Sequence, residues 1–275
     1  MSSSIAIVIP AYNAEATIAM ALESVLQQDS PPDEIIVVDD GSQDGTARIA
    51  AGFDSVRLIT QPNQGSAVAR QVGTEAAGSE YVAYLDADDW WPKDKISRCR
   101  QIIAAAGIDF MLSDLQRAYP GDYPTPSLPK NSTFFPWLAT FLQEGERHPS
   151  LPNLVRLEPN VGLSLLLKGF PVFPSTLLAK RSVIERVGGW DRRFRRCQDF
   201  DIGLRMSRQF PMHYLDEVHA ILGLHSANSD ATSYIVKQTT GDIAVLRAHL
   251  EDEFSDNDYR YQVAAAIGLK YRNLG

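Results

Sequence analysis

The sequence YVAYLDADDWW, Tyr81 to Trp91, places an apolar run directly before three aspartates. The run Tyr81–Leu85 predicts a buried β-strand that ends at the acidic residues. Carboxylates this close make each other harder to ionise, and such clusters persist mainly where a cation neutralises them or where they share protons. If the strand continues, Asp86 and Asp88 point to one side and Asp89 to the other. The alternative is a polar strand exit that caps the next helix, so the surrounding sequence has to decide.

Strands and helices are predicted to alternate over the first ninety residues. The expected strands are Ile5–Ile9, Glu34–Val38, Val56–Thr60 and Tyr81–Leu85. Three helices are expected between them, one capped by Asn13, one capped by Asp44, and one over Ser66–Ala76. This order implies right-handed βαβ units. It therefore predicts an α/β fold with a mainly parallel central sheet and helices on both faces.

Polar and acidic residues follow three of these predicted strands. They are PAYNAE (Pro10–Glu15), DDGSQDGT (Asp39–Thr46) and DADDWW (Asp86–Trp91). In open parallel sheets, ligands bind outside the carboxyl ends of the strands. The three segments therefore predict one ligand site at that edge of the sheet.

Composition narrows the class of ligand. The chain has 275 residues and a net charge of -8, which argues against nucleic-acid binding. The two cysteines lack metal-ligand spacing and indicate a reducing compartment. No apolar run is long enough to span a membrane, and the start MSSSIAIVIP does not read as a signal peptide. We therefore expect a cytoplasmic protein, with a peripheral position at the inner face of the cell membrane as an open alternative.

The pattern weakens after Gly107. Ala118–Ser132 contains four prolines and is expected to form a long loop. Later strands are expected at Ser175–Ala179 and Val218–Leu224, and later helices at Val161–Leu167, Ser182–Val187, Phe200–Ser207, Asp242–Glu253 and Tyr259–Tyr271. We expect one domain over residues 1–230, with halves 1–110 and 111–230, followed by a C-terminal helical extension, 231–275.

Neither standard phosphate-binding loop is present. The first strand–helix turn, PAYNAE, lacks the glycines of the dinucleotide fingerprint, and no G-x-x-x-x-G-K-[ST] occurs. An acidic edge with a divalent cation is the alternative. A hard cation such as Mn²⁺ or Mg²⁺ binds carboxylate and diphosphate oxygens together, and so joins groups that would otherwise repel.

Five motifs in order resemble the inverting family-2 glycosyltransferases of the GT-A fold. They are VIPAYNAEATI (Val8–Ile18), VVDDGSQDGT (Val37–Thr46), NQGSAVARQVG (Asn63–Gly73), YLDADD (Tyr84–Asp89) and GGWDRRFRRCQDFDIGLR (Gly188–Arg205). The resemblance covers most of the chain, from Ile5 to Ser229. It implies that residues 1–110 bind a nucleotide sugar and that residues 111–230 bind the acceptor and catalyse transfer.

The resemblance assigns the nucleotide contacts residue by residue. Asp39 matches the carboxylate that reads the base, by accepting the imide N–H of uracil. The backbone of Pro10, Ala11 and Tyr12 matches the segment that lies against the same base. Arg70 matches a cation near the nucleotide.

The same resemblance assigns the metal and the base. Asp86 is expected near the ribose, and Asp88 on the metal that bridges the diphosphate. His225 matches a histidine near that metal, and Asp199 matches the catalytic base. Asp201 is the alternative base, but two residues further along a helix it should face away from Asp199.

Two departures from the family pattern affect this assignment. Gln198 stands where a glutamate often precedes the base. Gly223 stands where many members have an arginine two residues before the histidine, which bears on the phosphate role of that loop. The resemblance assigns no role to Arg192–Arg196, which is interpreted either as a solvated loop or as a contact to an anionic acceptor. Trp190 reads as a core residue or a sugar-stacking platform.

The favoured function is a metal-dependent transferase. It would move a sugar from a nucleotide-diphosphate donor, a UDP-sugar, to a hydroxyl of a saccharide or lipid-linked glycan, as in bacterial polysaccharide synthesis. One alternative is a sugar nucleotidyltransferase, which usually opens with a Gly-rich basic loop that PAYNAE lacks. The other is an inactive sugar-binding module on the same fold. It is disfavoured because Asp39, Asp88 and Asp199 are all present.

Overall fold

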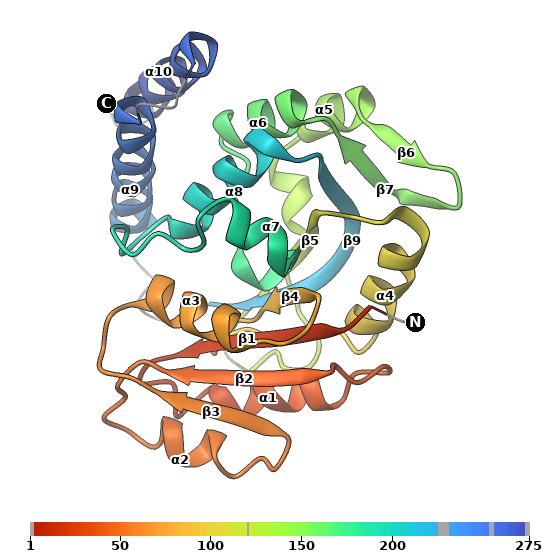
Figure 1. Cartoon of the computed structure of the whole chain (residues 1–275), viewed down its shortest axis with the longest axis vertical. Coiled ribbons are helices and arrows are strands. Elements are labelled where there is room, and N and C mark those ends of the chain that lie inside the picture. The colour runs from red at the N-terminus through yellow and green to blue at the C-terminus, as the bar shows by residue number, and fades with distance from the viewer. Residues whose placement is uncertain (1–2, 120, 225–230, 253–255, 273–275) are drawn as a thin grey trace.

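A computed structural model describes residues 3–119, 121–224, 231–252 and 256–272 (Figure 1). Its strands are β1 (Ile5–Ala11), β2 (Glu34–Asp39), β3 (Val56–Thr60), β4 (Tyr81–Tyr84), β5 (Phe110–Ala118), β6 (Glu146–His148), β7 (Leu151–Leu157), β8 (Leu178–Lys180) and β9 (Met212–Gly223). They form one sheet in the order β3-β2-β1-β4-β8-β5-β9-β7-β6.

The N-terminal half of this sheet is parallel. β2 pairs in parallel with β3 and β1, and β1 with β4, as the alternating pattern predicts. The second half is mixed, because β8 runs antiparallel to both β4 and β5, while β9 is parallel to β5 and antiparallel to β7. The fold is α/β, and the acidic turn after β4 lies where the parallel half meets the mixed half.

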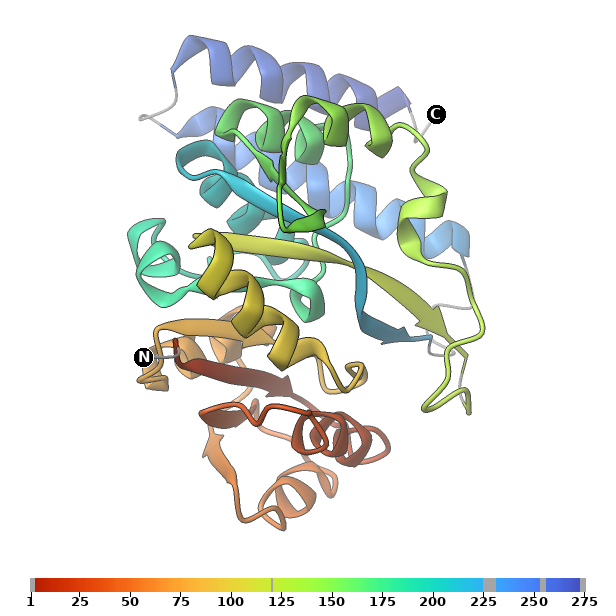
Figure 2. The same ribbon diagram turned by 90° about the vertical axis from the view of Figure 1, so that its right-hand side faces the viewer.

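Helices cover both faces of the sheet. They are α1 (Ile18–Leu26), α2 (Thr46–Ala50), α3 (Ser66–Ala76), α4 (Lys95–Ala106), α5 (Leu138–Glu144), α6 (Pro159–Leu167), α7 (Arg181–Arg186), α8 (Gln198–Gln209), α9 (Ala231–Glu251) and α10 (Asn257–Arg272), with 3-10 turns at Asn131–Phe134 and Pro174–Thr176. Figures 1 and 2 place α9 and α10 at the opposite end of the molecule from β3 and α2. None of the described helices is long and apolar enough to cross a membrane.

Alternate side chains of each buried strand enter two different cores. On β1, Ala6 and Val8 belong to the core that also contains residues of α3, α6 and α8, whereas Ile5, Ile7 and Ile9 belong to the core that contains residues of α1 and α4. This is the period of two that a sheet covered on both faces requires.

Helix α3 lies very close to β1. A Cβ added at Gly73 would lie 2.3 Å from Cγ1 of Val8, so only glycine fits this contact. Arg70 is one turn earlier on α3, so this close contact also fixes the position of Arg70 relative to the end of β1.

Two predicted caps differ from the structure. Asn13 does not cap α1, which begins at Ile18 with Thr17 as N-cap residue. Instead, Asn13 has a positive φ of 48°, and its backbone N–H and side-chain oxygen join it to Ser42 and Gln43. The short polar side chain of asparagine tolerates this left-handed conformation, which the cap prediction did not anticipate. Asp44 precedes the N-cap residue of α2, although its carboxylate still accepts the N–H of the first helical residue.

Several C-terminal elements are longer than the sequence predicts. β9 is twelve residues long and starts six residues before the expected strand, and α9 starts eleven residues before the expected helix. The expected strand at Ser175–Ala179 is a 3-10 turn followed by the short strand β8. The predicted loop after Ala118 is tied back to the sheet by an isolated bridge between Gln116 and Lys130.

Candidate active site

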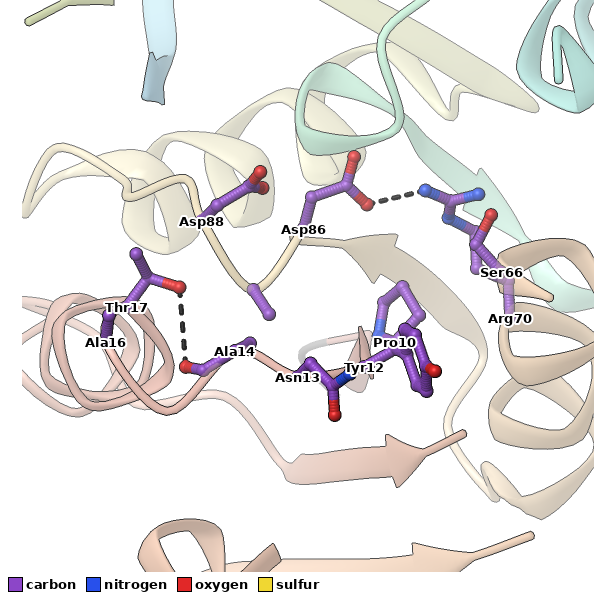
Figure 3. A pocket seen from close by; sticks show the side chains of 11 residues that line it. Pro10, Tyr12, Asn13, Ala14, Ala16, Thr17, Ser66, Arg70, Asp86 and Asp88 are labelled. Atoms are coloured by element: carbon purple, nitrogen blue, oxygen red, sulfur yellow. Dashed lines mark hydrogen bonds and ion pairs between the residues drawn. The ribbon is translucent and has the colours of Figure 1, made fainter. Parts of the chain in front are cut away.

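Two adjoining cavities lie at the carboxyl ends of β1 and β4. The first, of about 470 Å³, is lined by the first strand–helix turn, by α3 and by the acidic turn after β4 (Figure 3). The second, of about 600 Å³, is lined by the acidic turn, α8, α9, α10 and the segment 169–174. Asp86 and Asp88 line both cavities and so form their shared edge.

A tight turn splits the three aspartates. The Asp89 N–H donates to the Asp86 carbonyl at 3.0 Å, and Asp86 and Asp88 project to the same side of the turn (Figure 3). Asp89 is buried, and its carboxylate accepts the Ser175 hydroxyl at 2.5 Å and the Gly223 N–H at 3.1 Å. Burial, with the charges of Asp88 and Asp86, raises the pKa of Asp89 well above its ordinary value. The predicted division of the cluster is therefore present, although a turn produces it rather than a continued strand.

Arg70 is a buried cation in the first cavity. Its Nη2 lies 2.5 Å from Oδ1 of Asp86, and its side chain is only 5% exposed. Its Nε and Nη1 are buried and have no hydrogen-bond partner within the described part of the chain. The guanidinium carbon lies 5.0 Å from the ring centroid of Trp190, which is itself 4% exposed. Trp190 is therefore a core residue that supports Arg70, and its ring is too buried to stack on a sugar.

The adjacent acids Asp39 and Asp40 have different surroundings. Asp40 accepts three hydrogen bonds, from Gln61, Gln64 and Gly65, and so holds the turn before α3. Among the described residues, Asp39 accepts a hydrogen bond only from the Ser42 N–H, at 3.3 Å. Its Oδ1 is buried without a hydrogen bond in the described part of the chain. Asp39 thus keeps a free acceptor at the end of β2.

The first strand–helix turn lies beside Asp39. Ala11 is the register partner of Asp39 across the β1–β2 pair, and it is buried. Pro10 and Tyr12, on either side of it, line the first cavity, and Tyr12 is half exposed. Asp39 itself is not among the residues that line this cavity, but its register pairing with Ala11 places it next to the Pro10–Tyr12 segment.

Asp199 lines the second cavity from the first turn of α8. Burial raises its pKa to about 6, although the charge of Arg70 and the Phe200 N–H act in the opposite direction. The N–H of Phe200 donates to Oδ1 at 2.8 Å. The preceding Cys197 has a positive φ of 58°, which turns the chain sharply into the helix. Gln198, next to Asp199, donates to the Ser66 hydroxyl at 2.6 Å and joins α8 to α3.

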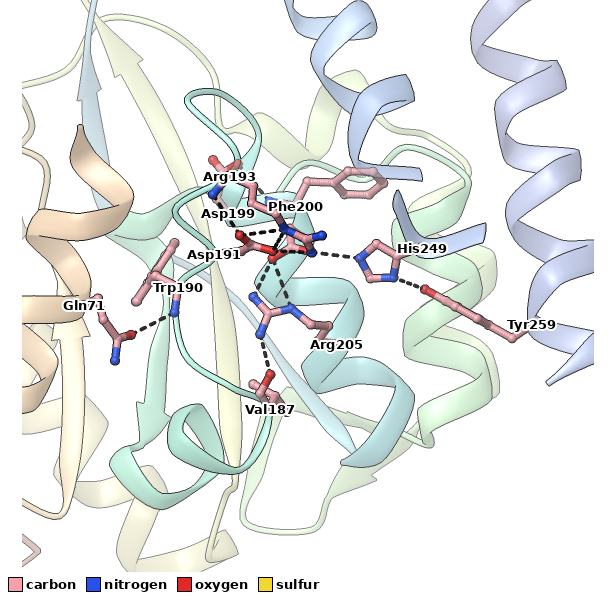
Figure 4. Close-up of polar contacts among 11 residues, drawn as sticks. Gln71, Val187, Trp190, Asp191, Arg193, Asp199, Phe200, Arg205, His249 and Tyr259 are labelled. Carbon is pink, nitrogen blue, oxygen red and sulfur yellow. Dashed lines mark hydrogen bonds and ion pairs between the residues drawn. The ribbon is translucent and has the colours of Figure 1, made fainter. Parts of the chain in front are cut away.

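Asp201 forms contacts away from the second cavity, as expected for a residue two positions after Asp199 on the helix. Its carboxylate pairs with Arg205 at 2.5 Å and with Nε2 of His249 at 2.9 Å. Figure 4 shows these contacts continuing from His249 to the hydroxyl of Tyr259, at 2.6 Å. Burial alone would raise the pKa of Asp201, but His249 and Arg205 outweigh it and the pKa is lowered. Asp201 therefore anchors α9 and α10 to α8 and is not available as a base.

The sequence reasoning missed the walls of the second cavity. Phe170 and Phe173 form an aromatic side, and Gln238, Asp242 and Lys270 form a polar side from α9 and α10. Asp242 and Lys270 are ion-paired. No local signal marks these residues, because helices distant in the sequence bring them to the cavity.

The predicted metal ligands are only partly covered by the structure. Among the described residues, no group of three or more histidines, cysteines or acids is arranged to hold a metal ion. His225 lies outside the described residues, so its predicted role stays a prediction. Asp88 fits a site that a ligand completes, because its carboxylate lies on the edge between the cavities.

Several similar proteins are named as glycosyltransferases. The glycosyltransferase TuaG of Bacillus subtilis, named for teichuronic acid biosynthesis, is 39% identical over 99 residues, which are 34% of this chain and 39% of TuaG. The "UDP-Glc:alpha-D-GlcNAc-diphosphoundecaprenol beta-1,3-glucosyltransferase WfgD" of Escherichia coli is 32% identical over 115 residues, 41% of this chain and 46% of WfgD. This chain thus matches less than half the length of either relative.

Two solved structures share the fold. S. aureus TarS 1-349, in complex with UDP-GlcNAc, has a TM-score of 0.70 at 16% identity, covering 99% of this chain and 73% of that one. The mannosyltransferase PcManGT from Pyrobaculum calidifontis, in complex with GDP-Man and Mn²⁺, has a TM-score of 0.67 at 18% identity, covering 100% and 72%.

The family model for glycosyl transferase family 2 matches residues 6–156. This range contains Asp39, Arg70, Asp86 and Asp88 but ends before Asp199, so the family match does not reach that residue. With its α/β architecture and its acidic turn at the carboxyl edge of the sheet, the chain belongs to glycosyl transferase family 2 and has the GT-A fold.

Proposed function

We propose that the chain transfers a sugar from a nucleotide-diphosphate donor to an acceptor hydroxyl, with inversion at the anomeric carbon. The observation that carries this proposal is the position of Asp199. It is a carboxylate with a pKa of about 6, in a cavity that shares Asp86 and Asp88 with the cavity at the strand ends.

The first cavity is assigned to the nucleotide. The buried, unpaired Oδ1 of Asp39 can accept the imide N–H of uracil, against the backbone of Pro10, Ala11 and Tyr12. A buried acceptor without a partner is unfavourable until a ligand donates to it. Arg70 adds a positive charge on the diphosphate side, where its Nε and Nη1, which have no partner among the described residues, can donate hydrogen bonds. One structural relative was solved with UDP-GlcNAc and another with GDP-Man, and Asp39 favours the UDP-sugar for this chain.

The edge between the cavities is assigned to a divalent cation, Mn²⁺ or Mg²⁺. Asp88 would hold it, and His225 is proposed as a further contact. Asp86 already pairs with Arg70 and is assigned to the ribose side. When bound, the cation neutralises charge on the departing diphosphate. One relative of similar fold was solved with Mn²⁺, which supports a metal at this edge.

The second cavity is assigned to the acceptor. A carboxylate with a pKa of about 6 is mostly ionised at pH 7, so Asp199 can take the proton of an acceptor hydroxyl. Attack from the side opposite the diphosphate inverts the anomeric carbon without a covalent intermediate. The acceptor class proposed is a saccharide or a lipid-linked glycan in polysaccharide synthesis. The name of WfgD, which includes a diphosphoundecaprenol-linked sugar, supports it.

The two alternatives are less well supported. A sugar nucleotidyltransferase would need a Gly-rich basic loop after β1, and Pro10–Glu15 is PAYNAE. An inactive binding module would have no need for a carboxylate of raised pKa between an aromatic wall and the acidic turn.

Calorimetric titration of UDP, with Mn²⁺ and with EDTA, tests the proposal. We expect tighter UDP binding with Mn²⁺, and we expect Asp88→Asn to remove most of that difference. Asp54→Asn, which removes an exposed carboxylate far from both cavities, should behave as the wild type. Equal UDP affinity with and without metal would contradict the cation site, and tighter binding of GDP than of UDP would contradict the role of Asp39.

A further inference from the structure

A basic groove borders the second cavity, between the loop before α8 and helix α9. Its volume is about 470 Å³, and it is lined by Arg193, Phe194, Arg195, Arg196, Val236, Lys237, Thr240, Gly241 and Ala244. Figure 1 shows this loop beside the first half of α9. The arginines are the part of the GGWDRRFRRC motif that the proposed chemistry leaves without a role.

The groove concentrates positive charge in an acidic protein. The chain has a net charge of -8, yet Arg193, Arg195, Arg196 and Lys237 all line this one surface and are exposed. Arg193 is paired with Asp191 at 2.7 Å. The other three form no ion pair within the described part of the chain. Such a patch attracts an anionic partner, whereas the acidic remainder of the molecule repels that partner.

Exposed aliphatic side chains lie next to these cations. Val236, in the groove, is 46% exposed, and the adjacent Ile235 is 55% exposed. Cations beside apolar side chains suit the interface of a bilayer, where the apolar groups enter the acyl boundary and the cations meet the lipid phosphates. A small soluble anion would be bound by the cations alone and would leave Val236 and Ile235 in water.

We propose that the basic groove docks this protein on an anionic lipid bilayer. This inference rests on the proposed function, because docking would serve transfer to a lipid-linked acceptor only if the adjoining second cavity binds that acceptor. Ile235 and Gln238 of α9 line that cavity, and Arg196 is three residues before Asp199. Docking through the groove therefore brings the mouth of the acceptor cavity to the bilayer surface, where a lipid-linked glycan is presented. The protein would occupy a peripheral position at the cell membrane.

Vesicle co-sedimentation tests the surface directly. We expect the full chain to bind vesicles of phosphatidylglycerol and phosphatidylcholine in equal parts, and not vesicles of phosphatidylcholine alone. Binding should weaken as salt rises, because exposed charges are screened. Arg195→Glu/Arg196→Glu should weaken binding by about tenfold or more, since each basic residue near such a surface contributes measurably. Val236→Ser should weaken it less, by about threefold.

The matched control is Arg48→Glu/Lys93→Glu, which makes the same charge change at exposed residues on α2 and before α4. It should bind vesicles nearly as the wild type does. Equal loss in this control would show an effect of net charge and overturn the proposal. So would equal wild-type binding to both kinds of vesicle, or a groove variant that loses affinity for free glycerol phosphate while vesicle binding is unchanged.

The UDP titration separates this inference from the proposed function. The groove variants should keep the wild-type UDP affinity, which also shows that they fold. Wild-type protein that binds anionic vesicles but not UDP would refute the proposed function and leave the docking surface standing. Wild-type protein that binds UDP but not the vesicles would refute the docking surface alone.

Discussion

At the scale of single residues, aspartates that are close in the sequence differ in what surrounds their carboxylates. Asp199 and Asp201 are two positions apart on α8, yet Asp199 faces a cavity while Asp201 is enclosed by Arg205 and His249. Asp39 and Asp40 are adjacent, and one keeps a free oxygen while the other is fully bonded. The sequence predicted roles for Asp39 and Asp199 only through motifs, since no local pattern distinguishes them from their neighbours.

The raised pKa of Asp199 makes a prediction about stability. Its pKa is about 6 in the folded protein against an ordinary 3.8, so the folded state binds the proton more tightly than the unfolded state. Stability is therefore lost as pH rises from about 4 to about 6, and the loss persists above pH 6. Asp199→Asn removes the ionisable carboxyl group and with it this loss of stability, so the unfolding free energy at pH 7.5 should rise by about 2–3 kcal/mol.

Thermal unfolding at two pH values checks this prediction. The melting temperature of Asp199→Asn should exceed that of the wild type by several degrees at pH 7.5 and by less at pH 4.5. Asp54→Asn should show no such pH-dependent gain, because Asp54 is exposed. A melting temperature below the wild-type value at pH 7.5 would mean that Asp199 is not destabilised as a carboxylate.

At the scale of elements, prediction succeeded where the pattern is local. The strands and helices up to β4 follow from alternating apolar runs and turn residues, and the helix expected at Ser182–Val187 is present as α7, followed by Gly188 and Gly189 at positive φ. The second half is less regular. β9 contains Asp216 and Glu217 and shifts register against β5 at Asp114, so its period of two is interrupted. Tertiary pairing, rather than the local sequence, defines that strand.

The contact between α9 and the loop before α8 gives the next prediction. A Cβ at Gly241 would lie 2.5 Å from Sγ of Cys197, two residues before Asp199, whereas nothing lies within 4 Å of one at Gly268 in α10. Alanine favours a helix over glycine by about 1 kcal/mol. Gly268→Ala should therefore stabilise the protein, while Gly241→Ala should destabilise it by about 1–3 kcal/mol through overpacking.

Transfer assays and unfolding together test this contact. Gly241→Ala should lower the turnover rate without changing UDP affinity, because it displaces the turn before Asp199. Adding Cys197→Ala removes the clashing sulfur and should restore much of both stability and turnover. Similar gains in stability for Gly241→Ala and Gly268→Ala would show that the contact does not constrain the loop.

At the scale of the whole molecule, the C-terminal helices complete the site. The sequence predicted residues 231–275 as a helical extension, and the motifs end before it. In the structure, Asp201, His249 and Tyr259 tie α8 to α9 and α10, and Asp242 and Lys270 line the second cavity. Four motifs predicted the residues around the first cavity, and the fifth predicted Asp199 in the second. The other walls of the second cavity could not be predicted, because they come from helices and loops with no shared pattern.

The stereochemistry of transfer shows whether Asp199 acts as the base of an inverting reaction. An α-linked UDP-sugar is incubated with the protein and Mn²⁺, and proton NMR records the first product, whether the sugar reaches an added acceptor or water. The account predicts release of UDP with a β-configured product before mutarotation, and a loss of about 10²–10⁴-fold in rate for Asp199→Asn at unchanged UDP affinity. An α-configured first product, or wild-type transfer by Asp199→Asn, would contradict it.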